Sequence, residues 1–161
     1  AAQLNWRTRI GAPIMSTPAV AKSTIVFGAS DGFIRGVSLN DGRVVWQHKA
    51  AKTVIASPEL DDRLAYVASA DGHMYALEIE TGELAWKTQV CRQVTSSSTI
   101  DGDVLYVGGN DASVSSLAIA TGEIVWRYLT AGAVVAKPLV THEHIIFGSL
   151  DSSIYALARG A

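Results

Sequence analysis

Residues 66–86 read YVASADGHMYALEIETGELAW, and the chain repeats this pattern with a period of forty residues. An apolar run beginning at Tyr66 leads into an Asp-Gly pair at Asp71, and a second apolar run leads into Thr81-Gly82 before Trp86. Short apolar runs separated by such turn pairs are typical of antiparallel β-strands joined by hairpins. The stretch therefore predicts part of a β-meander.

Three residue types return at the forty-residue step without an insertion. They are the tryptophans Trp6, Trp46, Trp86 and Trp126, the aspartates Asp31, Asp71, Asp111 and Asp151, and the glycines Gly42, Gly82 and Gly122. A repeat of about 40 residues with aromatic and glycine punctuation is typical of propeller blades built from four antiparallel strands. We predict an all-β β-propeller with four repeats in the chain.

The predicted blades divide a single domain, residues 1–161, at approximately 9–49, 50–89, 90–129 and 130–161. The last blade lacks the outer strand that carries tryptophan in the other repeats, whereas residues 3–8 have the sequence of such a strand. We expect strand 3–8 to complete the last blade.

The repeated residues are interpreted as structural. Each tryptophan is expected to lie between neighbouring sheets, and each glycine to supply the positive φ of a hairpin turn. A ring of four aspartates suggests calcium, but an aspartate beside a tight turn is better explained by hydrogen bonds to nearby backbone amides. We therefore predict no metal ligands.

Composition narrows the classes of function. Hydrophobic residues make up 48% of the 161 residues and charged residues 17%, which is typical of a folded domain. A net charge of −2 gives no basic footprint for nucleic acid, and no apolar run is long enough to span a membrane. The motifs of serine hydrolases, phosphate loops and Cys-x-x-Cys sites are missing, so the sequence favours a non-catalytic protein.

The pattern Tyr-Val-(Gly/Ala)-x-x-Asp-Gly-x-x-Tyr-Ala-Leu-x-x-x-Thr-Gly-Glu-x-x-Trp resembles the repeat of pyrroloquinoline-quinone-type (PQQ-like) β-propellers. Residues 66–86 match it nearly letter for letter and residues 106–126 match it well. The resemblance covers essentially the whole chain. It implies either a quinoprotein, in which eight blades hold the quinone and calcium, or a docking propeller such as an outer-membrane assembly lipoprotein or a kinase sensor domain. It also favours a periplasmic or other extracytoplasmic location.

This chain lacks the residues on which the quinone sites of the resembled family depend. Quinoprotein sites use a disulfide between adjacent cysteines and residues from loop insertions, whereas this chain has Cys91 alone and no insertions. We expect no cofactor, and PQQ is retained only through the family resemblance.

The number of blades raises the question of assembly. Family members usually have seven or eight blades, whereas a four-bladed ring would turn about 90° per blade and need bulky residues to fill the wedges. Small residues instead occupy the inner strands, at Ser16, Ala56, Ser96 and Ala136. We favour a homodimer in which two chains exchange strands to form one eight-bladed ring. A four-bladed monomer and half of a longer chain are the alternatives.

Candidate site residues come from loops and from positions where one repeat departs from its siblings. They are Lys52, Cys91, Arg92, Gln93, Lys137 and His73. Lys137 replaces a hydroxyl residue of the other repeats and could contact an anion in the channel, and Arg92 could meet an acidic partner. Arg35 replaces the tyrosine of two other repeats, and we expect its aliphatic stem to pack between sheets.

These observations predict a non-catalytic scaffold that presents its loop face to a protein partner. One alternative is a module that binds quinone or another small molecule, formed by dimerisation or within a larger chain. A second alternative is a sensory domain of a larger receptor or kinase.

Overall fold

The computed structural model describes residues 2–159, and its strands form four antiparallel sheets with no helix among these residues. The first two sheets contain β1 (Ala19–Ala21), β2 (Thr24–Gly28), β3 (Phe33–Ser38) and β4 (Val44–Lys49), then β5 (Glu59–Leu60), β6 (Leu64–Ala68), β7 (His73–Glu78) and β8 (Leu84–Gln89). The last two contain β9 (Thr99–Asp101), β10 (Val104–Gly109), β11 (Ser113–Ala118) and β12 (Ile124–Leu129), then β13 (Leu139–Val140), β14 (His144–Gly148) and β15 (Ile154–Ala158). Strands follow one another in chain order within each sheet, as in a meander. The predicted class of propeller blades is confirmed.

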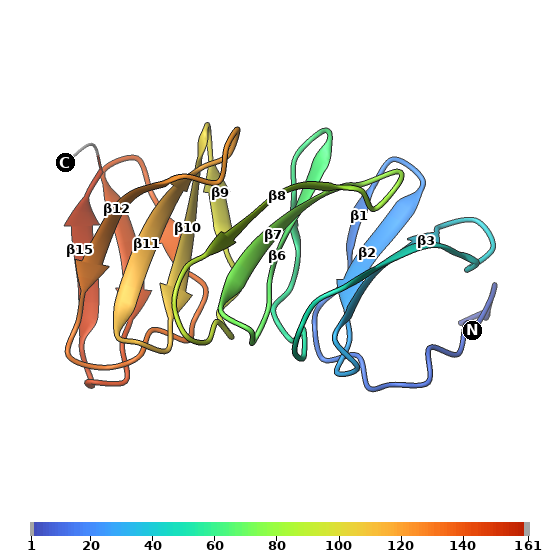
Figure 1. Cartoon of the computed structure of the whole chain (residues 1–161), viewed down its shortest axis with the longest axis horizontal. Helices are drawn as coiled ribbons and strands as arrows, with labels where there is room; N and C mark the ends of the chain where they lie inside the picture. Colours follow the sequence, from blue (N-terminus) through green and yellow to red (C-terminus); the bar gives the residue numbers. More distant parts are fainter. Residues whose placement is uncertain (1, 160–161) are drawn as a thin grey trace.

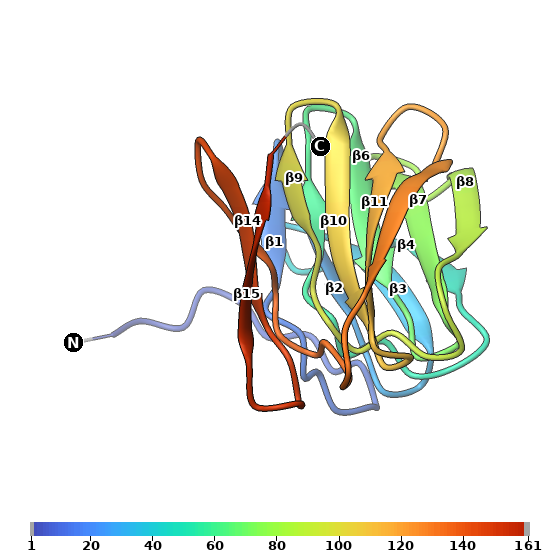
Figure 2. The same ribbon diagram turned by 90° about the vertical axis from the view of Figure 1, so that its left-hand side faces the viewer.

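The four sheets fan out in an open arc rather than a closed ring (Figure 1). The sheet of β1–β4 lies at one end of the arc, and the sheet of β13–β15 lies at the other, with the remaining two between them (Figure 1). Seen from the end that carries β14 and β15, these two strands lie in front of the other sheets (Figure 2). We call the four sheets blades 1 to 4 in chain order. No helix in residues 2–159 has the length and apolar character needed to cross a membrane.

The core of the arc consists of layers between successive blades. Between blades 1 and 2, Val26, Ile34 and Trp46 pack against Val67 and Leu77, all of them fully or almost fully buried. Equivalent clusters separate blade 2 from blade 3 and blade 3 from blade 4. Each blade therefore has two apolar faces, one toward the preceding blade and one toward the next.

Tryptophans of the outer strands fasten each blade to the next one. The indole Nε1 of Trp46 donates a hydrogen bond of 2.8 Å to the carbonyl oxygen of Ile79, and Trp86 donates one of the same length to Ile119. The Trp46 ring lies against Gly82, where a Cβ atom would stand only 2.6 Å from the ring. Glycine at this turn thus supplies both a φ of +72° and the space for the indole of the preceding blade.

The two ends of the arc differ in structure. Residues 2–10 form no strand, yet Trp6 donates a hydrogen bond of 3.0 Å to the Leu39 carbonyl at the blade 1 end. Blade 4 has only three strands, with β15 at its edge, and the N-terminal segment runs far from it across the arc (Figure 1). Within a single chain, strand 3–8 does not complete blade 4, and its pairing with a second chain stays a prediction.

Candidate functional site

The loops that join successive blades lie on one face of the molecule. The turns between the second and third strands of each blade lie on the same face. The Ala70 amide donates to the Thr53 carbonyl at 3.0 Å, and the Asn110 amide donates to the Gln93 carbonyl at 3.1 Å. The same link recurs between Leu150 and Ala133 at 2.8 Å. These links make a continuous surface, which we call the loop face, from loops 51–53, 91–93 and 131–133 and turns 29–32, 69–72, 109–112 and 149–152.

Asp71 holds its turn, its own blade and the preceding loop together. Its Oδ1 accepts the His73 amide at 3.0 Å, while its Oδ2 accepts the Tyr75 hydroxyl at 2.6 Å and the Ala51 amide at 3.0 Å. We call this arrangement the aspartate latch. Burial alone would raise the pKa of Asp71, but these hydrogen bonds outweigh it and lower that pKa.

Blade 4 repeats the aspartate latch. Asp151 accepts hydrogen bonds from the Ser153 amide at 2.9 Å, the Tyr155 hydroxyl at 2.6 Å and the Ala131 amide at 3.1 Å. The bond from Tyr155 is the main reason why the pKa of Asp151 is lowered to about 2.

In blade 1 an arginine replaces the phenol of the latch. The Arg35 guanidinium donates to both oxygens of Asp31, at 3.0 and 2.6 Å, and its side chain is only 8% exposed. This hydrogen-bonded ion pair lowers the pKa of Asp31. This burial is compatible with the expected packing of the Arg35 stem, but the expectation did not include the charged end. The guanidinium takes over the donor role of Tyr75, because both side chains reach the aspartate four residues earlier.

Blade 3 is the exception. Ser115 occupies the position of the latch tyrosine, and it is too short to play that part. The Asp111 carboxylate instead accepts the Ser113 hydroxyl at 2.6 Å, and Nη1 of Arg127 lies 3.9 Å from its Oδ2. The amide of Cys91, which corresponds to that of Ala51, donates a hydrogen bond of 3.3 Å to the Gly72 carbonyl instead of to the aspartate. The loop and the aspartate are thus not joined as they are in blades 2 and 4.

A polar pocket lies at this broken latch. Its volume is about 380 Å³, and it is lined by Lys52, Arg92, Gln93, Asn110 and Asp111. Among the described residues, the Lys52 ammonium and the Arg92 guanidinium have no hydrogen-bond or ion-pair partner, so the pocket rim carries two uncompensated positive charges. A second pocket beside it contains Cys91 and Arg127 together with Arg92 and Asp111.

The structure brings together three of the predicted site residues, Lys52, Arg92 and Gln93. Cys91 lies next to them but is only 7% exposed, its thiol contacts the Gln93 carbonyl at 2.9 Å, and burial raises its pKa. This is the environment of an inert thiol. His73 belongs to the latch of blade 2, where its Nδ1 lies 3.2 Å from Asp71.

Sequence reasoning missed Asn110 and Arg127 as neighbours of this pocket, and it assigned Asp111 only a turn role. The available signal was the serine at position 115, where the repeats of blades 2 and 4 have tyrosine. Ser115 is too short to reach the retained Asp111, so this position departs from the latch of the other blades.

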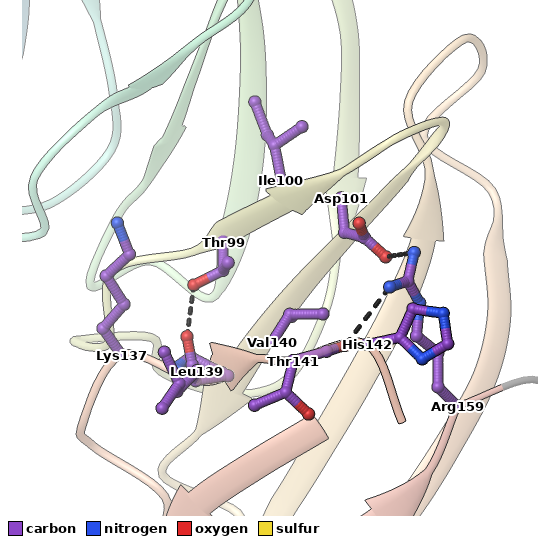
Figure 3. Close-up of a pocket in the computed structure, with 10 residues that line it drawn as sticks. Thr99, Ile100, Asp101, Lys137, Leu139, Val140, Thr141, His142 and Arg159 are labelled. Atoms are coloured by element: carbon purple, nitrogen blue, oxygen red, sulfur yellow. Dashed lines mark hydrogen bonds and ion pairs between the residues drawn. The ribbon is translucent and has the colours of Figure 1, made fainter. Parts of the chain in front are cut away.

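Lys137 lies in a separate pocket, between β9 and β13 (Figure 3). The pocket has a volume of about 540 Å³, and its charged groups are already paired: Lys137 with Glu59, and Arg159 with Asp101. Arg159 also donates to the Thr141 carbonyl at 3.2 Å (Figure 3). The structure thus gives Lys137 a carboxylate partner from blade 2, which competes with the predicted anion contact.

The donor set of a quinoprotein does not fit this chain. Among residues 2–159 no three or more histidine, cysteine, aspartate or glutamate side chains gather as a metal site. The latch aspartates are occupied by backbone amides and by Tyr75, Tyr155 or Arg35, and Cys91 has no neighbouring cysteine. We therefore derive no chemistry through a quinone or a calcium ion.

Comparison with solved structures supports the same fold. The computationally designed Ika4 protein matches 99% of this chain with 100% of its own, at a TM-score of 0.88 and 18% identity. BamB from Moraxella catarrhalis matches 96% of this chain with 49% of its own, at a TM-score of 0.84 and 18% identity. A quinohemoprotein alcohol dehydrogenase from Pseudomonas putida HK5 matches 91% of this chain with 30% of its own, at a TM-score of 0.79 and 14% identity. The chain thus spans about half the length of BamB and a smaller part of the dehydrogenase.

Sequence comparison identifies the family. No curated protein matches this chain in sequence. The family model described as outer membrane protein assembly factor BamB matches residues 2–98 and 92–160, which together cover nearly all of it. The repeat pattern, the four blades and this match agree, and the chain belongs to the BamB family of PQQ-like β-propellers.

Proposed function

We propose that the protein is a non-catalytic scaffold whose loop face binds an acidic segment of a protein partner. The observation that carries the proposal is the polar pocket at the broken latch of blade 3, where the charged ends of Lys52 and Arg92 have no partner within residues 2–159. Charged residues with no internal partner contribute little to stability and are available to a ligand.

The electrostatics of the loop face support this choice of partner. The carboxylates of Asp31, Asp71 and Asp151 are engaged by donors of their own blades. At the broken latch, two free cations therefore outweigh Asp111, whose Oδ2 already faces Arg127. A segment rich in glutamate or aspartate would gain ion pairs there and would encounter no unscreened carboxylate in the other latches.

The family description favours a role in assembling proteins at the outer membrane, and it supports an extracytoplasmic location. We further propose that the working form of the scaffold is a homodimer in which two chains make one eight-bladed ring. Such a ring would present two copies of the loop-face pocket, so a partner with two acidic segments could bind with avidity.

Peptide binding tests the loop-face proposal. A fluorescein-labelled deca-glutamate peptide should bind in low salt, as measured by fluorescence anisotropy, and deca-lysine should not. Arg92→Glu and Lys52→Glu should each weaken binding about fivefold or more, since an exposed ion pair contributes up to about 1 kcal/mol and reversal adds repulsion. Arg43→Glu, an equal change of charge in the β3–β4 turn, is the control and should bind like the parent.

Two results would overturn the loop-face proposal. One is equal weakening by Arg43→Glu, which would reveal attraction to net charge rather than to the pocket. The other is saturable quenching of tryptophan fluorescence by pyrroloquinoline quinone with calcium in the absence of peptide binding, which would favour a small-molecule module. Thermal melting of every variant should match the parent, because none of the three cations stabilises the fold through an internal ion pair.

A further inference from the structure

The N-terminal segment is held in the position of an outer strand whose own blade is missing. Trp46 and Trp86 each bond to a carbonyl 33 residues ahead, and Trp6 does the same with Leu39 at 3.0 Å. Thr8 repeats a second contact: its hydroxyl donates to the Gly42 carbonyl at 2.5 Å, as Thr88 does to Gly122 at 2.7 Å. Residues 6–8 therefore lie against blade 1 as β8 lies against blade 3, although no sheet pairs with them.

Blade 4 lacks the strand that this segment represents. In complete blades the third strand is covered by the fourth strand and by the next blade, so Ile34, Met74 and Val114 are all fully buried. Ile154, the equivalent residue on β15, is 79% exposed, and Leu139 on β13 is 60% exposed. Blade 4 thus presents a bare strand edge beside a bare apolar face.

The opposite end of the arc presents the complementary apolar surface. A pocket of about 320 Å³ lies between the N-terminal segment and blade 1, and its lining is almost entirely apolar. Trp6, Pro18, Ile25, Phe27 and Val37 are among its lining residues. This face of blade 1 corresponds to the face of blade 2 that covers Ile34, so it is shaped to receive the same position of a preceding blade.

We infer that residues 3–8 of a second copy of this chain pair with β15, and that Ile154 of each copy enters the apolar pocket at blade 1 of the other. This inference deepens the proposed homodimer by naming its contacts. The two ends of one chain supply both halves of the interface, and the N-terminal half is already held in place. Two arcs joined end to end in this way are related by a two-fold axis and contain two identical contacts.

The repeat fixes the register of the exchanged strand. Trp46, Trp86 and Trp126 lie opposite Gly36, Ala76 and Ser116, one small residue for each ring. The forty-residue step places Trp6 of the second copy opposite Ala156, which continues that series. The same step places Leu4 opposite Leu157 and Arg9 opposite Ser153.

Side-chain chemistry agrees with this register. Lys87 lies over the Tyr75 ring at 4.8 Å in blade 2. In the exchanged strand Arg7 takes the place of Lys87 and faces Tyr155, which has the position of Tyr75 in blade 4. A cation would therefore again lie over a tyrosine ring. The exposed β15 edge would gain the backbone hydrogen bonds that each complete blade already has, which removes an open edge from the molecule.

The curvature of the arc fits closure by two copies. The four blades of this chain align with 49% of BamB at a TM-score of 0.84, so two copies match the length of that chain. A foreign peptide at the blade 4 end would have to supply both a strand like that of Trp6 and an apolar surface like that of blade 1. A second copy carries both of these on one surface. We therefore commit to a second copy as the occupant.

Solution mass is the first test. The parent should sediment at twice the 17.0 kDa chain mass, as measured by analytical ultracentrifugation. Ile154→Glu should give a folded 17.0 kDa particle, because the residue is exposed within a single chain. Val125→Glu is the control: Val125 is 60% exposed on β12 of blade 3, outside the proposed contacts of blade 1 and blade 4, and its variant should remain a dimer. A parent of 17.0 kDa, or an open series of larger polymers, would overturn the inference.

Cross-linking tests the register independently of the Ile154 variant. The double variant Arg9→Cys with Ser153→Cys should form an intermolecular disulfide that doubles the mass on non-reducing gels, since the two positions are opposite one another on one face of the sheet. Thr8→Cys with Ser153→Cys places the two thiols on opposite faces and should stay uncross-linked. A dimer that cross-links only through Thr8 would contradict the register while leaving the homodimer standing. Neither result depends on the loop-face pocket, whose peptide binding is measured separately.

Discussion

The Tyr75 hydroxyl donates a hydrogen bond of 2.6 Å to Oδ2 of Asp71, and this carboxylate oxygen also accepts the backbone amide of Ala51 at 3.0 Å. Ala51 belongs to the loop that leaves blade 1, whereas Tyr75 and Asp71 belong to blade 2. One carboxylate therefore fastens two blades at the loop face. The indole of Trp46 fastens the same two blades at the opposite side of the molecule, through the Ile79 carbonyl.

Removal of the Tyr75 hydroxyl should loosen the blade 1–blade 2 joint. We expect Tyr75→Phe to lower the free energy of unfolding by about 1–2 kcal/mol, because a largely buried carboxylate loses a charge-assisted hydrogen bond while the ring packing is kept. Urea unfolding followed by tryptophan fluorescence measures this change. Tyr106→Phe is the control, since the Tyr106 hydroxyl has no hydrogen-bond partner among the described residues; equal losses in both variants would contradict the latch.

The fold could be predicted because its determinants lie within one repeat. Trp86, Gly82 and Asp71 each act through turn geometry or through contact with an adjacent blade, and a fixed period places them without knowledge of the whole. The equivalence of Arg35 and Tyr75 could not be read from residue class, since a cation and a phenol share only the ability to donate to an aspartate four residues earlier. The apolar pocket beneath Trp6 was equally hidden, because it depends on where the arc ends in space.

Truncation of Trp86 should cost far more than truncation of Trp6 in a single chain. Trp86 packs against the core between blades 2 and 3 and donates to Ile119, so Trp86→Ala should lose about 3–5 kcal/mol of unfolding free energy. Trp6 covers only the end of the arc, and its indole hydrogen bond is exposed. Both variants should be measured in the Ile154→Glu background, which isolates the single chain; a loss from Trp6→Ala as large as that from Trp86→Ala would be inconsistent with an open arc.

The hairpin glycines should differ in their tolerance of a methyl group. Gly82 and Gly102 both have positive φ, +72° and +57°, but only Gly82 faces an indole, at 2.6 Å from its hypothetical Cβ. We expect Gly102→Ala to cost about 1 kcal/mol from backbone conformation alone. Gly82→Ala should cost at least about 1 kcal/mol more, because the Trp46 ring must also move. Thermal unfolding of the two variants separates backbone strain from the steric term, and equal melting temperatures would argue against the tryptophan contact.

Acid should weaken the propeller through its latches. The pKa values of Asp31, Asp71 and Asp151 are all lowered in the folded state by hydrogen bonds, and that of Asp151 falls to about 2. A lowered folded pKa stabilises the protein above the unfolded value of 3.8, and this stabilisation disappears as pH falls through the folded value. The melting temperature should therefore be nearly flat from pH 7 to about pH 5 and should fall steeply from there toward about pH 2.

Replacement of a latch aspartate should flatten this pH dependence. Asp71→Asn should melt at a lower temperature than the parent at pH 7, because the amide cannot match the carboxylate as an acceptor of three hydrogen bonds. The two melting curves should converge as the parent's own carboxylate becomes protonated. Asp62→Asn, an exposed change in the turn between β5 and β6, should keep the parent's profile. If Asp71→Asn runs parallel to the parent down to pH 2, acid unfolding originates outside the Asp71 latch, and the Asp71–Tyr75 hydrogen bond has no part in it.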